Sequence, residues 1–298
     1  MAKLISWIKA ARPKTLLLSI ACTMMGGLLA ALEPSFNFPV VVFSALTALL
    51  LQNLSNFAND YGDFVKGTDD ENRAGPPRVL QSGELTKKQM RIGIIINAIL
   101  ALICGAVLIF VFVQLTWTEL AVFAGMGVLA IVAALLYTLG KHPYGYNGLG
   151  DLSIFLFFGW VAVFGTYYLA TKTIDFSVLL PASTMGFLSS AGMNVNNMRD
   201  YENDKVHKKH TMVVMMGQKN AYIYHCLLIG FSFVCLTVYL VIKQAPYYAY
   251  AFWLLSPLFI KDLIVIKRTK PELIDPFLGR LVRLSFLLAL VFCIPLLI

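Results

Sequence analysis

The sequence predicts an all-α membrane protein that forms a single domain over residues 1–298. Two features of the composition point to this class. Of the 298 residues, 58% are hydrophobic and only 13% are charged, whereas about 25% of the residues in an average soluble domain are charged. Apolar runs of about 18 to 25 residues recur along the chain, and each could cross a hydrocarbon core of about 30 Å.

Nine apolar runs fit the length of a membrane span. Hydropathy places them at residues 15–32, 39–58, 91–113, 119–138, 152–171, 177–198, 221–242, 249–266 and 281–298. With these spans, only Lys172 and Lys243 of the 24 lysines and arginines fall on the side opposite the N-terminus. Because cytoplasmic loops are enriched in these residues, we expect the N-terminus inside and the C-terminus outside the cell. Topology then explains the formal charge of +8, and no nucleic-acid partner is expected.

The segment before the first span alternates apolar and basic residues at helical spacing over residues 1–14. This pattern predicts a short helix that lies on the membrane surface. Its last cations, Arg12 and Lys14, either anchor the membrane edge or contact an anionic ligand.

The second span ends in a polar cluster that contains Asn56, Asn59, Asp60 and Asp63. Asn59 and Asp63 are four residues apart, so both side chains project from the same face of a helix. Carboxylates near the C-terminal end of a helix oppose its dipole and repel one another. The cluster therefore predicts that a cation binds there.

The longest polar stretch, residues 66–88, follows this cluster. It combines Asp69, Arg73, Arg78 and Gln81 with a Gly-Pro-Pro turn that restricts the backbone. Long ordered loops are often lids or binding loops. We therefore expect this loop to contact a ligand.

The fourth span ends in a short glycine-rich loop that carries Tyr137, Lys141, Tyr144 and Asp151. A plain turn needs fewer special residues. This loop is therefore a second candidate for ligand contact.

The sixth span ends in a second polar cluster. Asn196, Asp200 and Asp204 follow at i, i+4 and i+8, which predicts a continuous polar stripe on one helix face. Arg199 and Lys209 lie close by in the sequence. Because both clusters end spans that run in the same direction, the pattern suggests two parallel halves, about 1–138 and 139–298, that share a central site.

Two acidic clusters at one membrane face, each followed by cations, are typical of a site for Mg²⁺ and a diphosphate. Mg²⁺ prefers oxygen ligands and binds through one or two carboxylates together with substrate phosphates. Arginine and lysine can hold further phosphate oxygens. Since the site lies above apolar helices, an isoprenyl diphosphate is the expected substrate. The alternative is a cation-coupled transporter, whose site would lie nearer the midplane.

The two polar clusters resemble the signature motifs of the UbiA superfamily of intramembrane prenyltransferases. The first motif reads Asn59-Asp60-x-x-Asp63, with Gly67 in place of the last acid and Asp69 two residues later. The second has Asn197 in place of an acid but retains Asp200 and Asp204. The resemblance implies nine helices around a central cavity, cytoplasmic cap loops, Mg²⁺ as cofactor and lateral entry of a polyprenyl diphosphate.

The resemblance also assigns expected roles to single residues. It places Asp63, Asp200, Tyr137 and Lys141 at the reacting diphosphate. The expected Mg²⁺ ligands are Asn59, Asp60, Asp63, Asp69, Asn196, Asp200 and Asp204. The expected substrate-binding residues are Asn56, Arg73, Arg78, Gln81, Tyr144, Asp151, Arg199 and Lys209.

Residues 59–63, 73–81 and 144–151 are similar to the branch of this family that prenylates 1,4-dihydroxy-2-naphthoate in menaquinone synthesis. That similarity implies loss of CO₂ and diphosphate during transfer, with Arg73, Arg78, Gln81 and Asp151 as candidates for the acceptor pocket. It also implies a bacterial inner membrane with the site facing the cytoplasm, and no obligate protein partner. Other aromatic acceptors, such as 4-hydroxybenzoate or homogentisate, remain alternatives, and a haem or chlorophyll acceptor is a weaker one.

Overall fold

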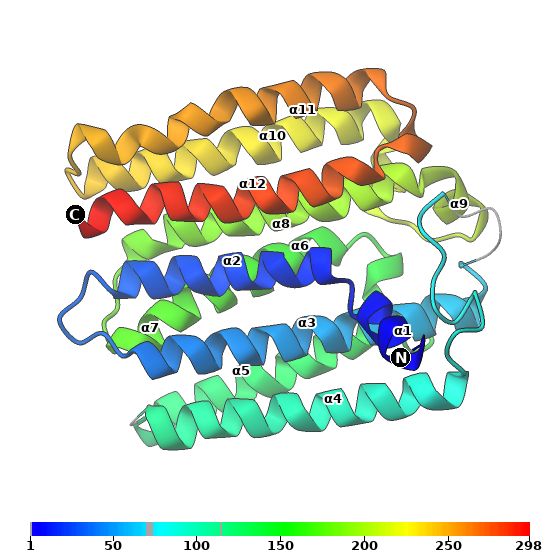
Figure 1. Cartoon of the computed structure of the whole chain (residues 1–298), viewed down its shortest axis with the longest axis horizontal. Coiled ribbons are helices and arrows are strands. Elements are labelled where there is room, and N and C mark those ends of the chain that lie inside the picture. The colour runs from blue at the N-terminus through cyan, green and yellow to red at the C-terminus, as the bar shows by residue number, and fades with distance from the viewer. Residues whose placement is uncertain (1, 70–73, 114) are drawn as a thin grey trace.

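The computed structural model describes residues 2–69, 74–113 and 115–298, and these residues form a bundle of long helices (Figure 1). Within the described residues, nine helical segments are long and apolar enough to cross a membrane. They run over Pro13–Ala30, Phe38–Lys66, Lys87–Phe112, Trp117–Leu136, Gly150–Thr171, Phe176–Arg199, Met212–Ile242, Tyr247–Arg268 and Asp275–Leu297. The predicted all-α class with nine spans is confirmed.

The spans are built from the following elements. The first half of the chain contains α1 (Ala2–Ala11), α2 (Pro13–Ala30), α3 (Phe38–Lys66), α4 (Lys87–Val107), η1 (Leu108–Phe112), α5 (Trp117–Leu136) and the short η2 (Tyr144–Tyr146). The fifth and sixth spans are α6 (Gly150–Ile154), η3 (Phe155–Phe164) and α7 (Gly165–Thr171), then η4 (Phe176–Val178) and α8 (Leu179–Arg199). The last part contains α9 (Tyr201–Val206), α10 (Met212–Ile242), η5 (Tyr247–Leu255), α11 (Ser256–Arg268), η6 (Pro271–Leu273), α12 (Asp275–Cys293) and η7 (Ile294–Leu297).

Helix boundaries follow local capping chemistry. Thr86 and Thr116 each form a capping box with the residue three positions later, which starts α4 and α5. The side chain of Asn37 caps α3. At the other end of α3, Gly67 has φ of 73°, a left-handed conformation that glycine adopts without strain. Hydropathy does not register these caps, so α3 continues eight residues beyond the predicted end at residue 58.

Close contacts between glycine and backbone hold the centre of the bundle together. α8 packs against α10 and η3, while α2 packs against α3, α12 and η3. A Cβ atom at Gly26 of α2 would lie 2.2 Å from the carbonyl oxygen of Val163, and one at Gly159 would lie 2.6 Å from that of Ala182. Small residues are enriched in membrane helix interfaces because they allow such close approach.

One predicted feature of the helices is wrong and one boundary differs. The stripe Asn196–Asp200–Asp204 does not lie on one helix, because α8 ends at Arg199 and α9 begins at Tyr201. The seventh span begins at Met212, nine residues before the predicted start, but Gly217 (φ 78°, ψ 158°) kinks α10 into two helices, and the second begins close to that start. In both places a local backbone turn, which side-chain periodicity does not report, sets the boundary.

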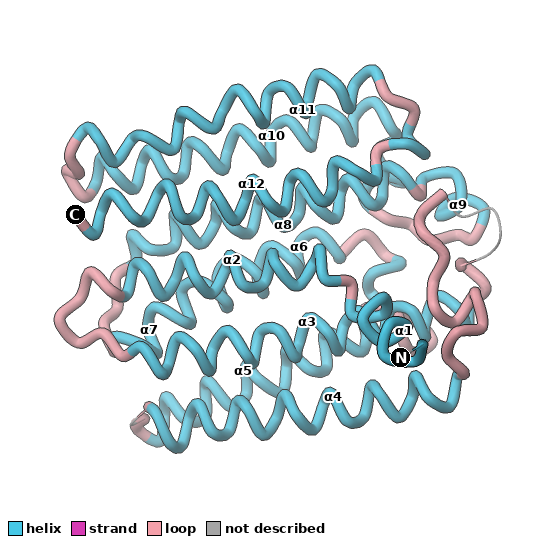
Figure 2. The backbone as a smooth tube through the Cα atoms, viewed as in Figure 1, coloured by secondary structure: helices cyan, strands magenta, loops and turns pink. Residues whose placement is uncertain are grey.

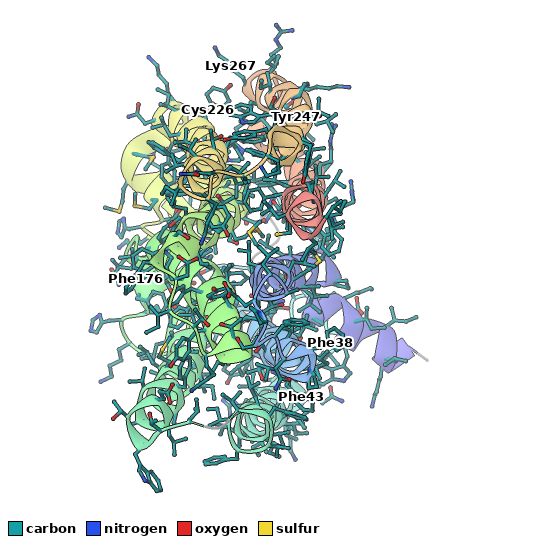
Figure 3. All side chains as sticks on the ribbon, turned by 90° about the vertical axis from the view of Figure 1, so that its left-hand side faces the viewer. Phe38, Phe43, Phe176, Cys226, Tyr247 and Lys267 are labelled. Atoms are coloured by element: carbon teal, nitrogen blue, oxygen red, sulfur yellow. The ribbon has the colours of Figure 1, made fainter. Side chains whose placement is uncertain are left out.

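The two ends of the bundle differ in polarity. The end that carries α1, α9 and the loops of residues 74–86 and 207–211 is called here the α1 end; the opposite one, near the C-terminus, is the far end (Figures 1 and 2). At the far end, Lys172 pairs with Glu119 and Lys243 pairs with Asp175. Figure 3 views the molecule from this end, where exposed aromatic residues begin several spans, among them the labelled Phe38, Phe176 and Tyr247.

Candidate active site

A cavity of about 880 Å³ runs through the interior of the helix bundle. Its wall is formed mainly by α2, α3, α5, η3 and α8. At the α1 end, the lining is polar and contains the residues Asn56, Asn59, Asp60, Arg78, Asn196, Asn197, Arg199, Asp200, Asp204 and Lys209. Toward the far end it becomes mainly apolar, with residues such as Leu108, Phe123, Met126, Phe158 and Leu169. The cavity therefore has a charged head and a hydrocarbon-like body.

The first acid in the head is Asp60, which is 2% exposed. Two guanidinium groups contact its Oδ1 atom, those of Arg12 and Arg78. Arg12 lies in the α1–α2 junction with φ of 52°, a conformation that non-glycine residues rarely adopt. Asn56 supports this junction, because its Nδ2 atom donates to the backbone oxygen of Ala11 at 2.8 Å. Two arginines thus share the Asp60 carboxylate at the cavity wall.

Asp63 lies one helical turn further along α3 and is also buried. It accepts a hydrogen bond from the hydroxyl of Tyr146 at 2.7 Å, and Lys209 Nζ lies 3.3 Å from its Oδ2 atom. The hydroxyl of Thr68 lies 2.7 Å from that of Tyr146. The Lys209 ammonium also lies 5.1 Å from the centre of the Tyr146 ring. Asp63 itself is behind the wall, while Lys209 lines the cavity.

Protonation in this cluster follows from its charges. Burial by itself lowers the pKa of Lys209, but the carboxylates of Asp63 and Asp204 raise that pKa above its ordinary value, so the ammonium stays charged. Burial and then the charge of Asp63 raise the pKa of Tyr146. Tyr146 is therefore a neutral phenol that donates to Asp63, and Lys209 is a fixed cation at the cavity wall.

The second polar cluster meets the first at the same end of the cavity. Asp200 forms a two-pronged pair with Arg199, at 2.8 and 2.7 Å. Arg199 also contacts Asp275 at the start of α12. Asp204 lies 4.0 Å from Lys209. Because the chain turns at Asp200, both Asp200 and Asp204 still line the cavity, although they do not share one helix.

The donor set suits a Mg²⁺ ion that arrives with its substrate. Among the described residues, no group of three His, Cys, Asp or Glu side chains is placed to hold a metal by itself. Mg²⁺ seldom uses such a complete protein cage and instead takes one or two carboxylates plus substrate phosphates. Asn59 Oδ1 is buried without a hydrogen-bond partner in the part of the chain that the structure describes. This oxygen, beside Asp60 and across the cavity from Asp200, is a ready ligand.

Of the residues predicted in the glycine-rich loop after α5, some line the cavity and one lies outside it. Tyr137 is buried and lines the cavity, and its ring packs edge-on against Tyr144 with the centroids 5.4 Å apart. The Tyr144 hydroxyl donates to the backbone oxygen of Ala133 at 2.9 Å. Lys141 is exposed and does not belong to the cavity wall, because the chain turns outward after Tyr137.

Of the predicted acceptor residues, the structure brings only Arg78 to the cavity wall. Gln81 accepts a hydrogen bond from the Arg78 backbone at 3.2 Å, and Asp69 Oδ1 lies 3.8 Å from Arg78 Nε. Both therefore position Arg78 and do not themselves line the cavity. Asp151 is buried behind the wall, and its backbone oxygen accepts from Ser190 at 3.1 Å. Arg73 lies outside the described residues.

Pattern in the sequence does not identify three residues at the charged head. It leaves Arg12 as either a membrane-edge anchor or a contact for an anionic ligand, and it does not single out Asp275 or Tyr146. Tyr146 follows Tyr144 in the same glycine-rich segment, so composition alone could not distinguish the tyrosine that reaches Asp63. Its contact spans 83 positions of sequence and depends entirely on the tertiary fold.

Comparison with known proteins adds an independent line of evidence. The profile of the UbiA prenyltransferase family matches residues 19–293. A 1,4-dihydroxy-2-naphthoate octaprenyltransferase of Haemophilus influenzae is 42% identical over 299 residues, which cover 99% of this chain and 97% of that protein. Its Escherichia coli counterpart is 40% identical and covers 96% and 93%.

Solved structures show the same fold at low identity. A UbiA homologue from Archaeoglobus fulgidus, bound to GPP and Mg²⁺, has a TM-score of 0.65 at 15% identity and covers 96% of this chain and 99% of that one. An apo UbiA homologue from Aeropyrum pernix has a TM-score of 0.65 at 16% identity and covers 95% and 96%.

Proposed function

The chain belongs to the UbiA prenyltransferase family, and from this membership we propose that it transfers a polyprenyl chain to 1,4-dihydroxy-2-naphthoate. The donor is a polyprenyl diphosphate, and CO₂ and diphosphate leave. One observation carries this proposal: a cavity of about 880 Å³ has two acidic motifs and several cations at one end and a mainly apolar lining beyond them. Relatives that are 40–42% identical over nearly the whole chain are named for this reaction.

The charged head is the site of the diphosphate. Asn59, Asp200 and Asp204, which line the head, would hold Mg²⁺, with Asp60 and Asn196 beside them. Asp63 lies behind the wall and holds Lys209 in place. When bound, Mg²⁺ neutralises charge that develops on the leaving diphosphate. Lys209, held charged by Asp63 and Asp204, offers an ammonium to the phosphate oxygens. Arg199 and Lys14 meet at Asp275, so cations from α8 and α2 surround the same opening.

Breaking the bond between the first prenyl carbon and the diphosphate oxygen leaves an allylic cation in the apolar part of the cavity. The buried, neutral ring of Tyr137 lines the wall between the head and the body of the cavity. An aromatic face stabilises a nearby cation. Water is kept out by the surrounding apolar residues, so the cation reacts with the ring carbon of the acceptor and not with water.

The acceptor carboxylate binds between Arg12 and Arg78. These two guanidinium groups share the single carboxylate of Asp60 and both line the cavity, so they have donors to spare. Planar guanidinium groups bind carboxylates in a bidentate manner. In the overall reaction a ring carbon gains a bond to the prenyl carbon, and the ring carboxylate departs as CO₂, leaving its bonding electrons with the ring.

The orientation in the membrane is part of the same proposal. Apart from Lys172 and Lys243, the lysines and arginines lie in loops at the α1 end or in the half of a span nearer to that end. The positive-inside rule then places the charged head at the cytoplasmic face of a bacterial inner membrane.

The reaction is tested with the purified protein, geranyl or octaprenyl diphosphate, Mg²⁺ and one acceptor at a time. We expect a prenylated product of the mass of 1,4-dihydroxy-2-naphthoate minus CO₂ plus the prenyl group, with CO₂ released in equal amount. Product with 4-hydroxybenzoate or homogentisate alone would retain the reaction class and overturn the acceptor. Accumulation of unchanged diphosphate ester in proteoliposomes would instead indicate a transporter.

A further inference from the structure

The cavity extends far beyond its charged head. On α3, both Asp60 and Ser44 line it, and these residues are 16 positions apart. At 1.5 Å per residue this corresponds to about 24 Å along the helix axis. The apolar body therefore reaches most of the way to the far end of the bundle.

Two kinds of helical glycine bear on the shape of the cavity. At Gly26, Gly159 and Gly186, an added Cβ would lie within 2.7 Å of a neighbouring helix, so these glycines serve helix packing. At Gly127 of α5 and Gly165 of α7, an added Cβ would meet no atom within 4 Å, and both residues line the cavity. Gly165 is nevertheless buried in the wall. Packing does not require glycine at either position, so the space before them belongs to the cavity.

One aromatic residue lines the cavity close to these glycines. Phe123 lies one helical turn from Gly127, so both project from the same face of α5. The Phe123 ring stacks on Tyr168 of the α7 segment with centroids 5.5 Å apart and planes 10° apart. This contact holds the Phe123 ring in place at the wall.

With the polyprenyl tail in this apolar body, as the proposed function requires, we propose that Gly127 and Gly165 keep the cavity wide enough for a long tail and that Phe123 limits the tail's length. This inference rests on the proposed function, because it assigns the tail of the same donor. A polyprenyl tail carries only hydrocarbon, and its burial against apolar walls is favourable in proportion to the area covered. The residues at positions 123, 127 and 165 then determine which prenyl chain lengths the enzyme accepts.

The test compares kcat/KM for geranyl diphosphate and for octaprenyl diphosphate, with one acceptor, in Gly127→Leu and in Gly125→Leu. Gly125 is the matched control, because it lies on the same helix, also has open space before it, and does not line the cavity. We expect Gly127→Leu to lower the octaprenyl-to-geranyl ratio by at least about tenfold, since a filled hydrophobic pocket discriminates on this scale. Gly125→Leu leaves the ratio unchanged.

Two more variants make the outcome independent of any single substitution. Gly165→Leu fills the cavity from α7 and lowers the ratio in the same direction, whereas Phe123→Ala lengthens the cavity and raises it. An unchanged ratio in both leucine variants, with folding verified by thermal unfolding in detergent, overturns the inference. Wild-type protein that prenylates nothing with either diphosphate would instead refute the proposed function, so the two failures are distinguishable.

Discussion

At the scale of single residues, each of the two buried acids of α3 is held by two partners at the cavity head. Asp63 is held by Tyr146 and Lys209, while Asp60 is held by Arg12 and Arg78. Buried charges are destabilising unless they are paired or hydrogen-bonded. Each buried carboxyl group therefore has charged or hydrogen-bonding partners, and each cation stays close to the place where a diphosphate would bind.

Asp63→Asn keeps the shape of the side chain but removes its charge. We expect kcat/KM to fall by about 100-fold or more, the scale on which removal of one preorganised electrostatic group acts. The control is Asp175→Asn at the far end, where Asp175 pairs with Lys243, a lysine that does not line the cavity, unlike Lys209. Wild-type turnover of the Asp63 variant, or an equal loss in the Asp175 variant, would contradict a role of Asp63 in holding Lys209 at the cavity wall.

Tyr146→Phe removes the hydroxyl that donates to Asp63 at 2.7 Å. A hydrogen bond to a charged group contributes about 1.5–3 kcal/mol. Because Asp63 also pairs with Lys209, which lines the cavity, we expect the KM for the prenyl diphosphate to rise at least about tenfold. The measurement is a titration of initial rates with the prenyl diphosphate, with thermal unfolding recorded in parallel. Tyr248→Phe, which alters an exposed ring at the far end, is the control. An unchanged KM for the prenyl diphosphate would show that Tyr146 does not support the pair of Asp63 and Lys209.

At the scale of secondary-structure elements, the bundle depends on a few places where helices approach without side chains between them. The contact of α2 with η3 at Gly26 is the closest of these, since an added Cβ would lie 2.2 Å from the Val163 carbonyl oxygen. α2 also carries Lys14 and Thr15 at the cavity head, so its position affects both stability and the site.

Gly26→Ala should therefore destabilise the protein. Overpacking of a tight contact costs about 1–3 kcal/mol, and a lower midpoint of thermal unfolding in detergent would report it. Gly230→Ala is the matched control, because it lies within a helix and has no atom within 4 Å of the added Cβ. Replacing glycine by alanine in a helix interior is otherwise stabilising. If Gly26→Ala raised the unfolding midpoint as Gly230→Ala does, the close α2–η3 contact would be refuted.

The loop between α3 and α4 brings Arg78 to the cavity by several local contacts. Gln81 holds the Arg78 backbone, and the segment packs its Val79 and Leu80 into a small apolar cluster with Phe57 and Met90. The described part of this loop, residues 74–86, therefore presents the Arg78 guanidinium group to the cavity through packed and hydrogen-bonded neighbours.

Arg78→Lys keeps the charge but loses the planar fork. Since lysine cannot form bidentate pairs, we expect the KM for the aromatic acid to rise about tenfold while the KM for the prenyl diphosphate changes little. Arg91→Lys is the control, because Arg91 contacts Tyr61 outside the cavity wall. An equal rise in both KM values for Arg78→Lys would place this residue at the diphosphate.

At the scale of the whole molecule, the odd number of candidate spans among the described residues places the two termini at opposite ends of the bundle (Figure 1). The α1 end carries the polar loops and the cavity head, and the far end carries two ion pairs and a row of exposed aromatic residues. Such an asymmetric molecule has one preferred orientation in a membrane.

That orientation is testable with single cysteines in intact bacterial cells. Tyr247→Cys at the far end (88% exposed) should react with a membrane-impermeant thiol reagent. Val206→Cys at the α1 end (75% exposed) should react only after the membrane is permeabilised. Wild-type protein corrects for the natural cysteines, all of which lie within the spans. The reverse pattern of labelling would place the cavity head outside the cytoplasm.

The sequence by itself determined the class of the molecule, the number of spans and the two polar clusters, because composition and hydropathy are local properties of the chain. It also identified Asp60, Asp200 and Asp204, which do line the cavity. Only the tertiary structure decided which of the selected residues face that cavity, which support it from behind and which, like Lys141, lie outside. Lys209 meets Asp63 across 146 positions and Tyr146 meets it across 83. Such contacts depend on how helices pack and where loops turn, and no periodicity within one segment records them.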